Sequence, residues 1–310
     1  MRRTIPAFSV LAAIRTELAK VGPLLRHDAG HAAKVAQGVD GLSPEEQERQ
    51  TYLWWLMWGP DIPEVPAGST HCFTELRQQD IARLLEAGII EETVGAANVS
   101  CFLVCEPSRQ RARVIMWPEH RNIEIEKAGY VCDMALKHPN EIAAMMWKCD
   151  VLFSVDVTAS FYTILVPEAQ RGLYRFEFGG ESYQLTRMAM GVRPAAEFMN
   201  NCCRVISRPP QHLSALQTST HIDNILCGGT PAEVEEMFDV LMDRCEKFKM
   251  PLNDNPKRSD IGPVQEYCGF VYDAKNKTTE MSSKMRAKFD ETAWDEVVTC
   301  RDYLRLFSLH

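Results

Sequence analysis

The sequence contains no long hydrophobic run and no strong excess of one charge. Its most apolar stretch, residues 52–58, is far shorter than the roughly 18 residues that a membrane span needs, so no contact with a membrane is expected. Acidic residues outnumber basic ones by 42 to 34, which gives a formal net charge of −8. A mildly acidic chain is no general binder of polyanions. Any contact with nucleic acid must therefore come from a local basic surface.

Familiar catalytic and metal-binding motifs are missing as well. The chain has no GxxxxGK[ST] loop, no GxGxxG turn and no HExxH pair, which removes the enzyme classes that those motifs mark. Its 11 cysteines show no CxxC spacing, and cysteine and histidine nowhere follow the spacing of a zinc finger. We therefore expect an intracellular protein with reduced thiols.

The composition itself is that of a globular protein, with 45% apolar and 25% charged residues in a chain of 310. Residues 1–16 contain three arginines and no acid, a pattern typical of mitochondrial transit peptides and equally compatible with an amphipathic helix. Both interpretations stay open. The compartment, nuclear, cytoplasmic or mitochondrial, is not predicted.

Residues 1–65 are expected to form a helical N-terminal extension. Ser43-Pro44 is a helix-start signal, a tryptophan-rich helix follows, and a Pro/Gly-rich linker over residues 59–68 ends it. Trp54, Trp55 and Trp58 recur at helical spacing, which favours a place in the core over stacking on bases.

Beyond the linker, helices and strands alternate without the regularity of βαβ units, which predicts an α+β fold. We expect helices over residues 74–87, 138–147, 194–206 and 231–249, and one from 282. We expect strands over residues 99–105, 113–117, 151–156, 174–178, 182–186 and 266–272, with a basic hairpin loop over 106–112 and a strand–turn–strand over 219–227.

Two acids stand out because each lies where a strand meets a turn. Asp156 ends an apolar strand, and Asp223 lies at the tip of the expected hairpin. Acids among apolar neighbours need a partner charge. A divalent cation such as Mg²⁺ accepts one or two carboxylates together with substrate phosphates. Two acids that merely end unrelated strands are the alternative.

The order of the surrounding segments resembles that of the reverse transcriptases, in particular those of LTR and tyrosine-recombinase retrotransposons. The resemblance covers roughly residues 70–290. The similar segments are motif A at Phe153–Glu168, motif B at Tyr183–Phe198, motif C at His221–Asn224, motif D at Leu252–Lys257, the primer grip at Tyr267–Phe270, and the fingers at Leu84–Glu91 and Arg111–Asn122.

This resemblance implies a right-hand polymerase fold and a role for each matched residue. Residues 66–150 would form the fingers, residues 151–280 the palm with an inserted fingers hairpin, and residues 281–310 the start of a thumb that is mostly absent. Asp156 and Asp223 would hold two Mg²⁺ or Mn²⁺ ions. Phe161 would exclude a 2′-hydroxyl and so select deoxynucleotides.

The remaining implied roles concern the nucleotide and its phosphates. Met190 and Gly191 would lie against the incoming nucleotide. Arg111 and Arg113, on the basic fingers loop, would grip its triphosphate, since arginine suits phosphate geometry. Lys257 would protonate the leaving pyrophosphate. The implied partners are an RNA template, a primer or nascent DNA, and a deoxynucleoside triphosphate.

Motif C departs from the usual pattern because Asn224 stands where reverse transcriptases carry a second acid. At an effective dielectric of about 20 and ~4 Å, a pair of unit charges is worth roughly 4 kcal/mol, and about double against a dication. Metal affinity should therefore fall. Polymerases of negative-strand RNA viruses are similar in carrying Asp-Asn in this hairpin.

Two hypotheses follow. The chain is either an RNA-directed DNA polymerase (a nucleotidyltransferase) of retroelement origin, or a catalytically silent relative that binds RNA or protein partners as a scaffold. A third interpretation, an unrelated α+β protein, requires Asp156 and Asp223 to lie far apart.

Overall fold

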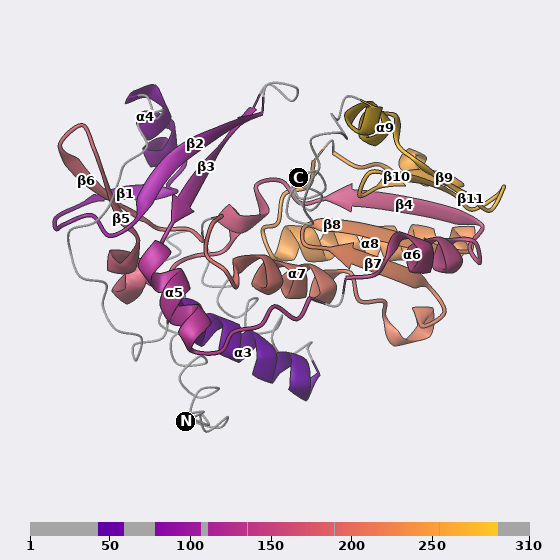
Figure 1. Ribbon diagram of the computed structural model, residues 1–310. Coiled ribbons are helices and arrows are strands. Elements are labelled where there is room, and N and C mark those ends of the chain that lie inside the picture. Colours follow the sequence, from indigo (N-terminus) through magenta and orange to yellow (C-terminus); the bar gives the residue numbers. More distant parts are fainter. Residues whose placement is uncertain are drawn as a thin grey trace.

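The computed structural model describes residues 43–58, 78–106, 111–134, 136–188, 190–253 and 255–290, with backbone alone for 103–106, 111–114 and 288–290. The arginine-rich start, the 59–68 linker and residues 291–310 lie outside this part. Figure 1 shows two lobes, one around strands β1 to β3, β5 and β6 and the other around β4 and β7 to β11, with helix α7 between them. Mixed helix and sheet confirm the α+β prediction.

The helices are α3 (Pro44–Trp58), α4 (Gln78–Glu86), α5 (Glu119–Lys127), α6 (Pro139–Met146), α7 (Ala195–Ile206), α8 (Pro231–Lys247) and α9 (Ser283–Asp290). Short 3₁₀ helices are η3 (Ser160–Thr163), η4 (Glu168–Tyr174), η5 (Gln211–Leu213) and η6 (Arg258–Asp260). The strands are β1 (Ile90–Thr93), β2 (Ser100–Glu106), β3 (Arg111–Trp117), β4 (Val151–Asp156), β5 (Arg175–Phe178), β6 (Glu181–Leu185), β7 (Gln217–His221), β8 (Asn224–Gly229), β9 (Val264–Tyr267), β10 (Phe270–Asp273) and β11 (Thr278–Met281). Among the described residues, no helix is long and apolar enough to cross a membrane.

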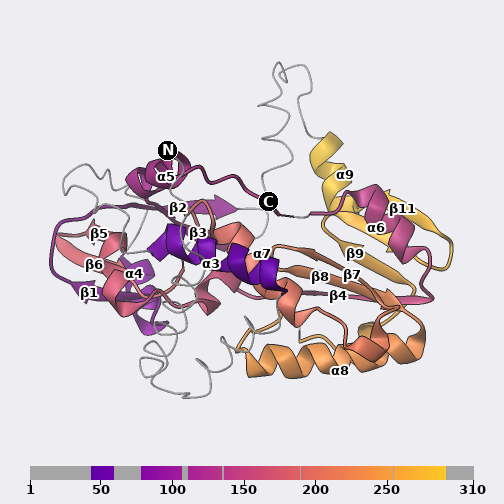
Figure 2. The same ribbon diagram turned by 90° about the horizontal axis from the view of Figure 1, so that it is seen from below.

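The central sheet is antiparallel, with the strand order β4–β8–β7. Alternate side chains of β4 enter two different cores. Phe153 and Val155 join the main core, whereas Leu152 joins a smaller cluster with Tyr267 and Tyr272. In Figure 2 the sheet accordingly lies between α8 on one side and α6 with β9 to β11 on the other.

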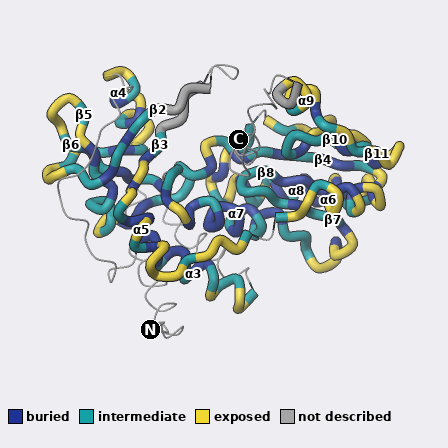
Figure 3. The backbone as a smooth tube through the Cα atoms, viewed as in Figure 1, coloured by how far each residue is buried: buried dark blue, intermediate teal, exposed yellow. Residues whose placement is uncertain are grey.

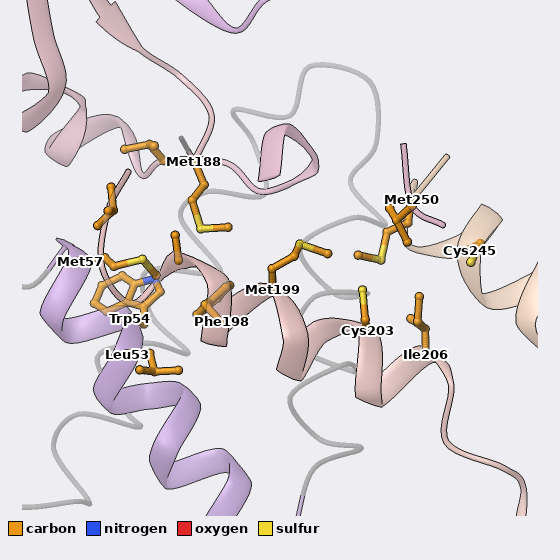
Figure 4. Close-up of a cluster of buried hydrophobic side chains, with 14 of the residues drawn as sticks. Leu53, Trp54, Met57, Met188, Phe198, Met199, Cys203, Ile206, Cys245 and Met250 are labelled. Carbon is orange, nitrogen blue, oxygen red and sulfur yellow. The ribbon is translucent and has the colours of Figure 1, made fainter. Parts of the chain in front are cut away.

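Helix α7 lies in the middle of the main core, and 8 of its 12 residues are buried. In Figure 4 its side chains meet those of α3 at Phe198, and meet Cys245 and Met250 at Cys203 and Ile206. Figure 3 shows the same burial as a dark-blue stretch along α7. Helix α7 therefore packs between α3 and the end of α8 with the segment that follows it.

Helix α3 packs on α7 through polar as well as apolar contacts. The buried Glu197 carboxylate accepts from Arg49 Nε at 2.5 Å, and Asn201 Nδ2 donates to Gln50 Oε1 at 3.0 Å. Ser43 caps α3 as predicted, because Glu46 N–H donates to its hydroxyl at 3.3 Å. The residues that follow Ser43 are thus joined closely to the rest of the described fold.

Trp54 and Trp58 are buried, which confirms their prediction as core residues, while Trp55 is partly exposed. The C-terminal end of α3 is hydrogen-bonded by residues that are distant in the sequence. Met57 C=O accepts from both Arg121 Nη2 at 2.9 Å and the Tyr174 hydroxyl at 3.0 Å. These two donors supply partners for a carbonyl in the last turn of the helix, where helical partners run out.

Candidate active site

The pairing of β4 with β8 brings the two acids of motifs A and C together. Asp156 lies directly opposite Asn224 in the antiparallel register, and Asp223 is the preceding residue. Val157 N–H donates to Asp223 C=O at 2.9 Å, so the two acid-bearing segments touch through their backbones. Opposed residues in such a pair have Cα atoms about 4.5–5.5 Å apart. The geometry therefore excludes the interpretation in which the acids lie far apart.

Asp156 and Asn224 lie on the face of the sheet that carries the β9–β10 hairpin. Side chains alternate along a strand, so Asp156 shares a face with Ser154, and Asn224 shares one with Leu226. Ser154 Oγ donates to Glu266 C=O of β9 at 3.1 Å, and Leu226 joins the cluster that contains Tyr267. The acids thus lie where the sheet, the β7–β8 turn and the β9–β10 hairpin meet.

The β7–β8 turn has an unusual backbone. Ile222 and Asp223 form a two-residue loop, and Ile222 has a positive φ of 58°. A β-branched residue in this region is an outlier, because its Cβ crowds the backbone. Ile222 N–H donates to Asn200 Oδ1 at 2.9 Å, so α7 contacts the turn directly.

Both carboxylate oxygens of Asp223 already have donors. The Ser160 hydroxyl donates to Oδ2 at 2.9 Å, and the Asn224 amide donates to Oδ1 at 3.0 Å. An aspartate in place of Asn224 could not donate in this way unless it were protonated. Asn224 therefore both removes a charge from the site and orients the acid that remains.

Both acids contribute to the raised pKa values of two cysteine thiols near the site. Burial raises the pKa of Cys268 to about 12, and both Asp223 and Asp156 add to this effect. Burial also raises the pKa of Cys203 well above its usual value, with smaller contributions from neighbouring groups that include both acids. The thiols belong to α7 and to the β9–β10 turn. The field of the two carboxylates thus reaches both elements.

His221 precedes the two-residue turn and lies opposite Asn224 in the β7–β8 register. Burial lowers the pKa of His221, while the nearby Asp223 carboxylate acts in the opposite direction. The imidazole therefore favours its neutral form near pH 7.

Phe161 lies in η3, one residue after the serine that contacts Asp223, and packs against the main core. Its backbone is set by a turn in which Ala159 has a positive φ of 48°. The structure thus brings Phe161 into the neighbourhood of the acids, and its role as a gate remains a prediction.

Gly191 is required by the fold itself. It has a φ of +119°, and a Cβ built on it would lie 1.9 Å from Met116 C=O. Met116 N–H donates to Met190 C=O at 3.1 Å, and Asn122 Nδ2 donates to Gly191 C=O at 2.8 Å. Close contact with β3 and α5 therefore explains the glycine. The predicted contact of Met190 and Gly191 with a nucleotide stays a prediction.

The basic fingers loop is shorter than predicted. Arg111 and Arg113 belong to strand β3, where they lie opposite Glu106 and Val104 in the β2–β3 register. The placement of Arg111 in the loop over residues 106–112 is therefore wrong, whereas Arg113 lies in a strand, as the expected strand over residues 113–117 has it. The pairing of β2 with β3 continues further than the apolar pattern indicates. Residues 107–110 and the side chains of both arginines lie outside the described part.

Lys257 is exposed, and its backbone N–H donates to Asp260 at 2.7 Å. The segment that contains it starts beside the acids, where Asn253 N–H donates to Asp156 C=O at 2.8 Å. By Gly262 it has reached Leu152, four residues back along β4. The proton transfer predicted for Lys257 remains a prediction.

The donor atoms at the site suit a hard cation. Asp156 and Asp223 offer carboxylate oxygens, and Asn224 offers an amide oxygen, which match Mg²⁺ rather than zinc. Within the described ranges, no group of three or more His, Cys, Asp or Glu side chains could hold a metal. Two carboxylates and one amide oxygen give Mg²⁺ only part of its octahedral shell, so water or phosphate would have to supply the rest.

Sequence reasoning missed two side chains at the site. Ser160 and Asn200 are buried, and each bonds to the motif C turn, from 63 and 22 residues away along the chain respectively. The only available signal for Asn200 was an amide on an apolar helix face. Ser160 lies inside motif A, where its hydroxyl is the feature that could have been noticed.

Comparison with known proteins gives a fold but no sequence family. No protein-family model matches the chain, and no curated protein matches it significantly. Solved structures of foamy viral protease-reverse transcriptase do match. One, in complex with double-stranded DNA, has a TM-score of 0.58 and 13% identity, covering 88% of this chain and 50% of that one. Another, in complex with an RNA/DNA hybrid, has a TM-score of 0.55 and 12% identity, covering 84% and 37%.

A third match is the native enzyme of prototype foamy virus, with a TM-score of 0.52, 13% identity, and coverage of 81% of this chain and 35% of that one. The chain therefore spans about half or less of the length of these structures. Its fold is reverse-transcriptase-like.

Proposed function

We propose that this chain is an RNA-directed DNA polymerase domain of retroelement origin, which transfers deoxynucleotides to a primer on an RNA template. The observation that carries the proposal is the cross-strand pairing that sets Asp156 beside Asp223 at the end of the central sheet. The reverse-transcriptase-like fold supports it. Residues 66–150 would then act as fingers, residues 151–280 as palm, and residues from 281 as the start of a thumb.

In this proposal Asp156 and Asp223 bind the cation, and Ser160 and Asn224 fix the Asp223 carboxylate. Mg²⁺ or Mn²⁺ bound there, two ions in the full mechanism, would offset the charge on the attacking and leaving oxygens of phosphoryl transfer. Phe161 selects the sugar, and Met190 and Gly191 lie under the new base pair. Arg111 and Arg113 bind the triphosphate, and Lys257 protonates the leaving group.

Primer extension on a poly(rA) or heteropolymeric RNA template, with Mg²⁺ or Mn²⁺, tests the proposal. We expect incorporation of deoxynucleotides that Asp156→Ala abolishes. Asp150→Ala is the matched control, because Asp150 is an exposed acid just before the opposite end of β4. Activity that is absent in the folded wild type, or equal in Asp156→Ala, would refute the catalytic proposal.

One observation favours a second candidate, a silent scaffold that binds RNA or protein. Asn224 donates to Asp223, so the turn is satisfied by protein groups alone. This candidate predicts RNA binding that persists in EDTA and in Asp223→Ala, together with no primer extension. Retained extension by the wild type would exclude it.

A further inference from the structure

The turn that presents Asp223 is unfavourable in isolation. Ile222 has a positive φ of 58°, and a β-branched side chain makes that conformation costly. Strain of this kind persists only where the surroundings impose it, and it is concentrated at functional sites. The turn therefore needs a partner that holds it.

Asn200 is that partner. Its Oδ1 accepts the Ile222 N–H at 2.9 Å, and its side chain is completely buried in α7. Its Nδ2 is also buried and, among the described residues, has no hydrogen-bond partner. An unpaired buried donor destabilises a fold, so packing alone does not account for an amide here.

The helix that carries Asn200 is held firmly on its other side. Three residues close to Asn200 in α7 bond to α3. Gln50 Nε2 donates to Phe198 C=O at 3.3 Å, Gln50 Oε1 accepts from Asn201 at 3.0 Å, and Arg49 forms an ion pair with the buried Glu197. Figure 4 shows this part of α7 between α3 and the segment of Met250. Asn200 thus acts from a rigid support.

We propose that Asn200 is a positioning residue, which holds the Ile222–Asp223 turn so that the Asp223 carboxylate is presented beside Asp156. Its oxygen supplies the acceptor that this strained conformation needs, and the neighbouring residue Asp223 is then within reach of Ser160 Oγ. The importance of this contact for metal binding rests on the proposed function. The claim that Asn200 holds the turn is independent of that function.

The first experiment compares two buried amides on one helix. Asn200→Leu removes the acceptor of the turn, and Asn201→Leu removes the bond to Gln50 without touching the turn. Amide hydrogen exchange at Ile222, followed by NMR, should become several-fold faster in Asn200→Leu alone. Mn²⁺ affinity, measured by electron paramagnetic resonance with Mn²⁺ alone, should fall about tenfold or more in the same variant. Both variants should lower the melting temperature.

The second experiment is a rescue. Glycine adopts positive φ without strain, so Ile222→Gly should make the turn independent of its holder. The double variant Asn200→Leu/Ile222→Gly should then regain most of the Mn²⁺ affinity that Asn200→Leu loses. The Ile222→Gly substitution relieves the strain in the turn. If Asn200→Leu alone does not fold, Mn²⁺ affinity can therefore be compared between Ile222→Gly and the double variant.

Equal Ile222 exchange in Asn200→Leu and Asn201→Leu would overturn the proposal, as would a double variant that gains nothing. If the wild type neither binds Mn²⁺ nor extends primers, the proposed function fails. Ile222 exchange then still decides whether Asn200 holds the turn.

Discussion

Two tight turns meet at the candidate site, and they are built in opposite ways. Cys268 and Gly269, between β9 and β10, both have positive φ, at 50° and 82°, as a type I′ hairpin turn requires. In the Ile222–Asp223 turn, between β7 and β8, the positive φ falls on a β-branched residue. The first turn has a glycine at one of its two positive-φ positions, whereas the second has an isoleucine at its positive-φ position.

The difference lies in where the support comes from. Gly269 makes its turn favourable locally. The Ile222 turn is supported by the Asn200 side chain, and its acid is bonded to Ser160 and Asn224. The strained backbone at Ile222 costs stability, and such strain persists where the surrounding structure imposes it, often at functional sites. We therefore infer that the β9–β10 turn serves the fold, whereas the Ile222–Asp223 turn serves the proposed site.

The largest expected effect on stability comes from a substitution in the β9–β10 turn. Gly269→Val places a β-branched residue at a φ of 82° with its Cβ 2.9 Å from Met285 Sδ, and we expect a loss of about 2–3 kcal/mol in the free energy of unfolding. Urea denaturation measures it. Gly180→Val is the control, because Gly180 has a similar φ of 85° in the β5–β6 turn and nothing within 4 Å. An equal loss in both variants would mean that backbone strain acts alone, and no loss in either would contradict the argument.

The second prediction concerns Asn224. Asn224→Asp removes the donor to Asp223 and adds a charge opposite Asp156, so without metal we expect a loss of about 1–2 kcal/mol in stability. With the added charge, Mn²⁺ affinity and any primer extension should rise, the affinity by about tenfold or more. Electron paramagnetic resonance with Mn²⁺ measures the affinity, and melting temperatures with and without Mg²⁺, together with primer extension, measure stability and activity.

The matched control for Asn224→Asp is Asn276→Asp. Asn276 Nδ2 donates to Asp273 at 2.7 Å, which is the same Asn–Asp contact at an exposed turn away from the two acids. It should show no gain with Mg²⁺. If Asn224→Asp gains neither stability with Mg²⁺ nor primer extension, Asn224 does not lie at a working metal site, and the scaffold proposal is favoured.

Local signals predicted most elements of the fold. The bounds of β4 are those expected, and α8 begins at Pro231 because Thr230 and Glu233 form a capping box that the sequence displays. Helix α5 was missed. Its buried residues include Arg121 and Asn122, whose partners are Met57 C=O and Gly191 C=O. Such polar burial depends on tertiary contacts and leaves no hydrophobic period.

The same limit applies to the site. Asp156 and Asp223 could be found because a strand end and a hairpin tip are local features. Ser160 and Asn200 could not, since their contacts with the turn form only when distant segments pack together. Gly191 was found for a reason other than the one the structure gives, because a glycine pattern does not say what approaches it.

The third prediction compares the hydroxyl groups that support the two hairpins. Ser160 Oγ donates to the Asp223 carboxylate at 2.9 Å, whereas Ser219 Oγ meets the Tyr267 hydroxyl at 3.3 Å, and both serines are buried. Ser160→Ala should cost about 1–1.5 kcal/mol, and Ser219→Ala somewhat less, since bonds to charged groups are stronger. Only Ser160→Ala should weaken Mn²⁺ binding. An equal effect of both variants on Mn²⁺ would remove the distinction between the turns.

The smallest expected effect concerns the residues that precede the turns, His221 and Tyr267. Burial lowers the pKa of His221 below its ordinary value of 6.5, against the pull of Asp223. As pH falls through about 6.5, the unfolded chain takes up this proton before the folded chain does, so stability falls with pH in that window. His221→Gln should flatten the dependence of unfolding free energy on pH between pH 7 and the lowered pKa.

Tyr267 provides the contrast, because burial raises its pKa and the phenol stays neutral in both states, so Tyr267→Phe should leave the slope unchanged. A slope that is identical in wild type and His221→Gln would show that the imidazole titrates alike in the folded and unfolded chain, and that the motif C turn is open to water at this position.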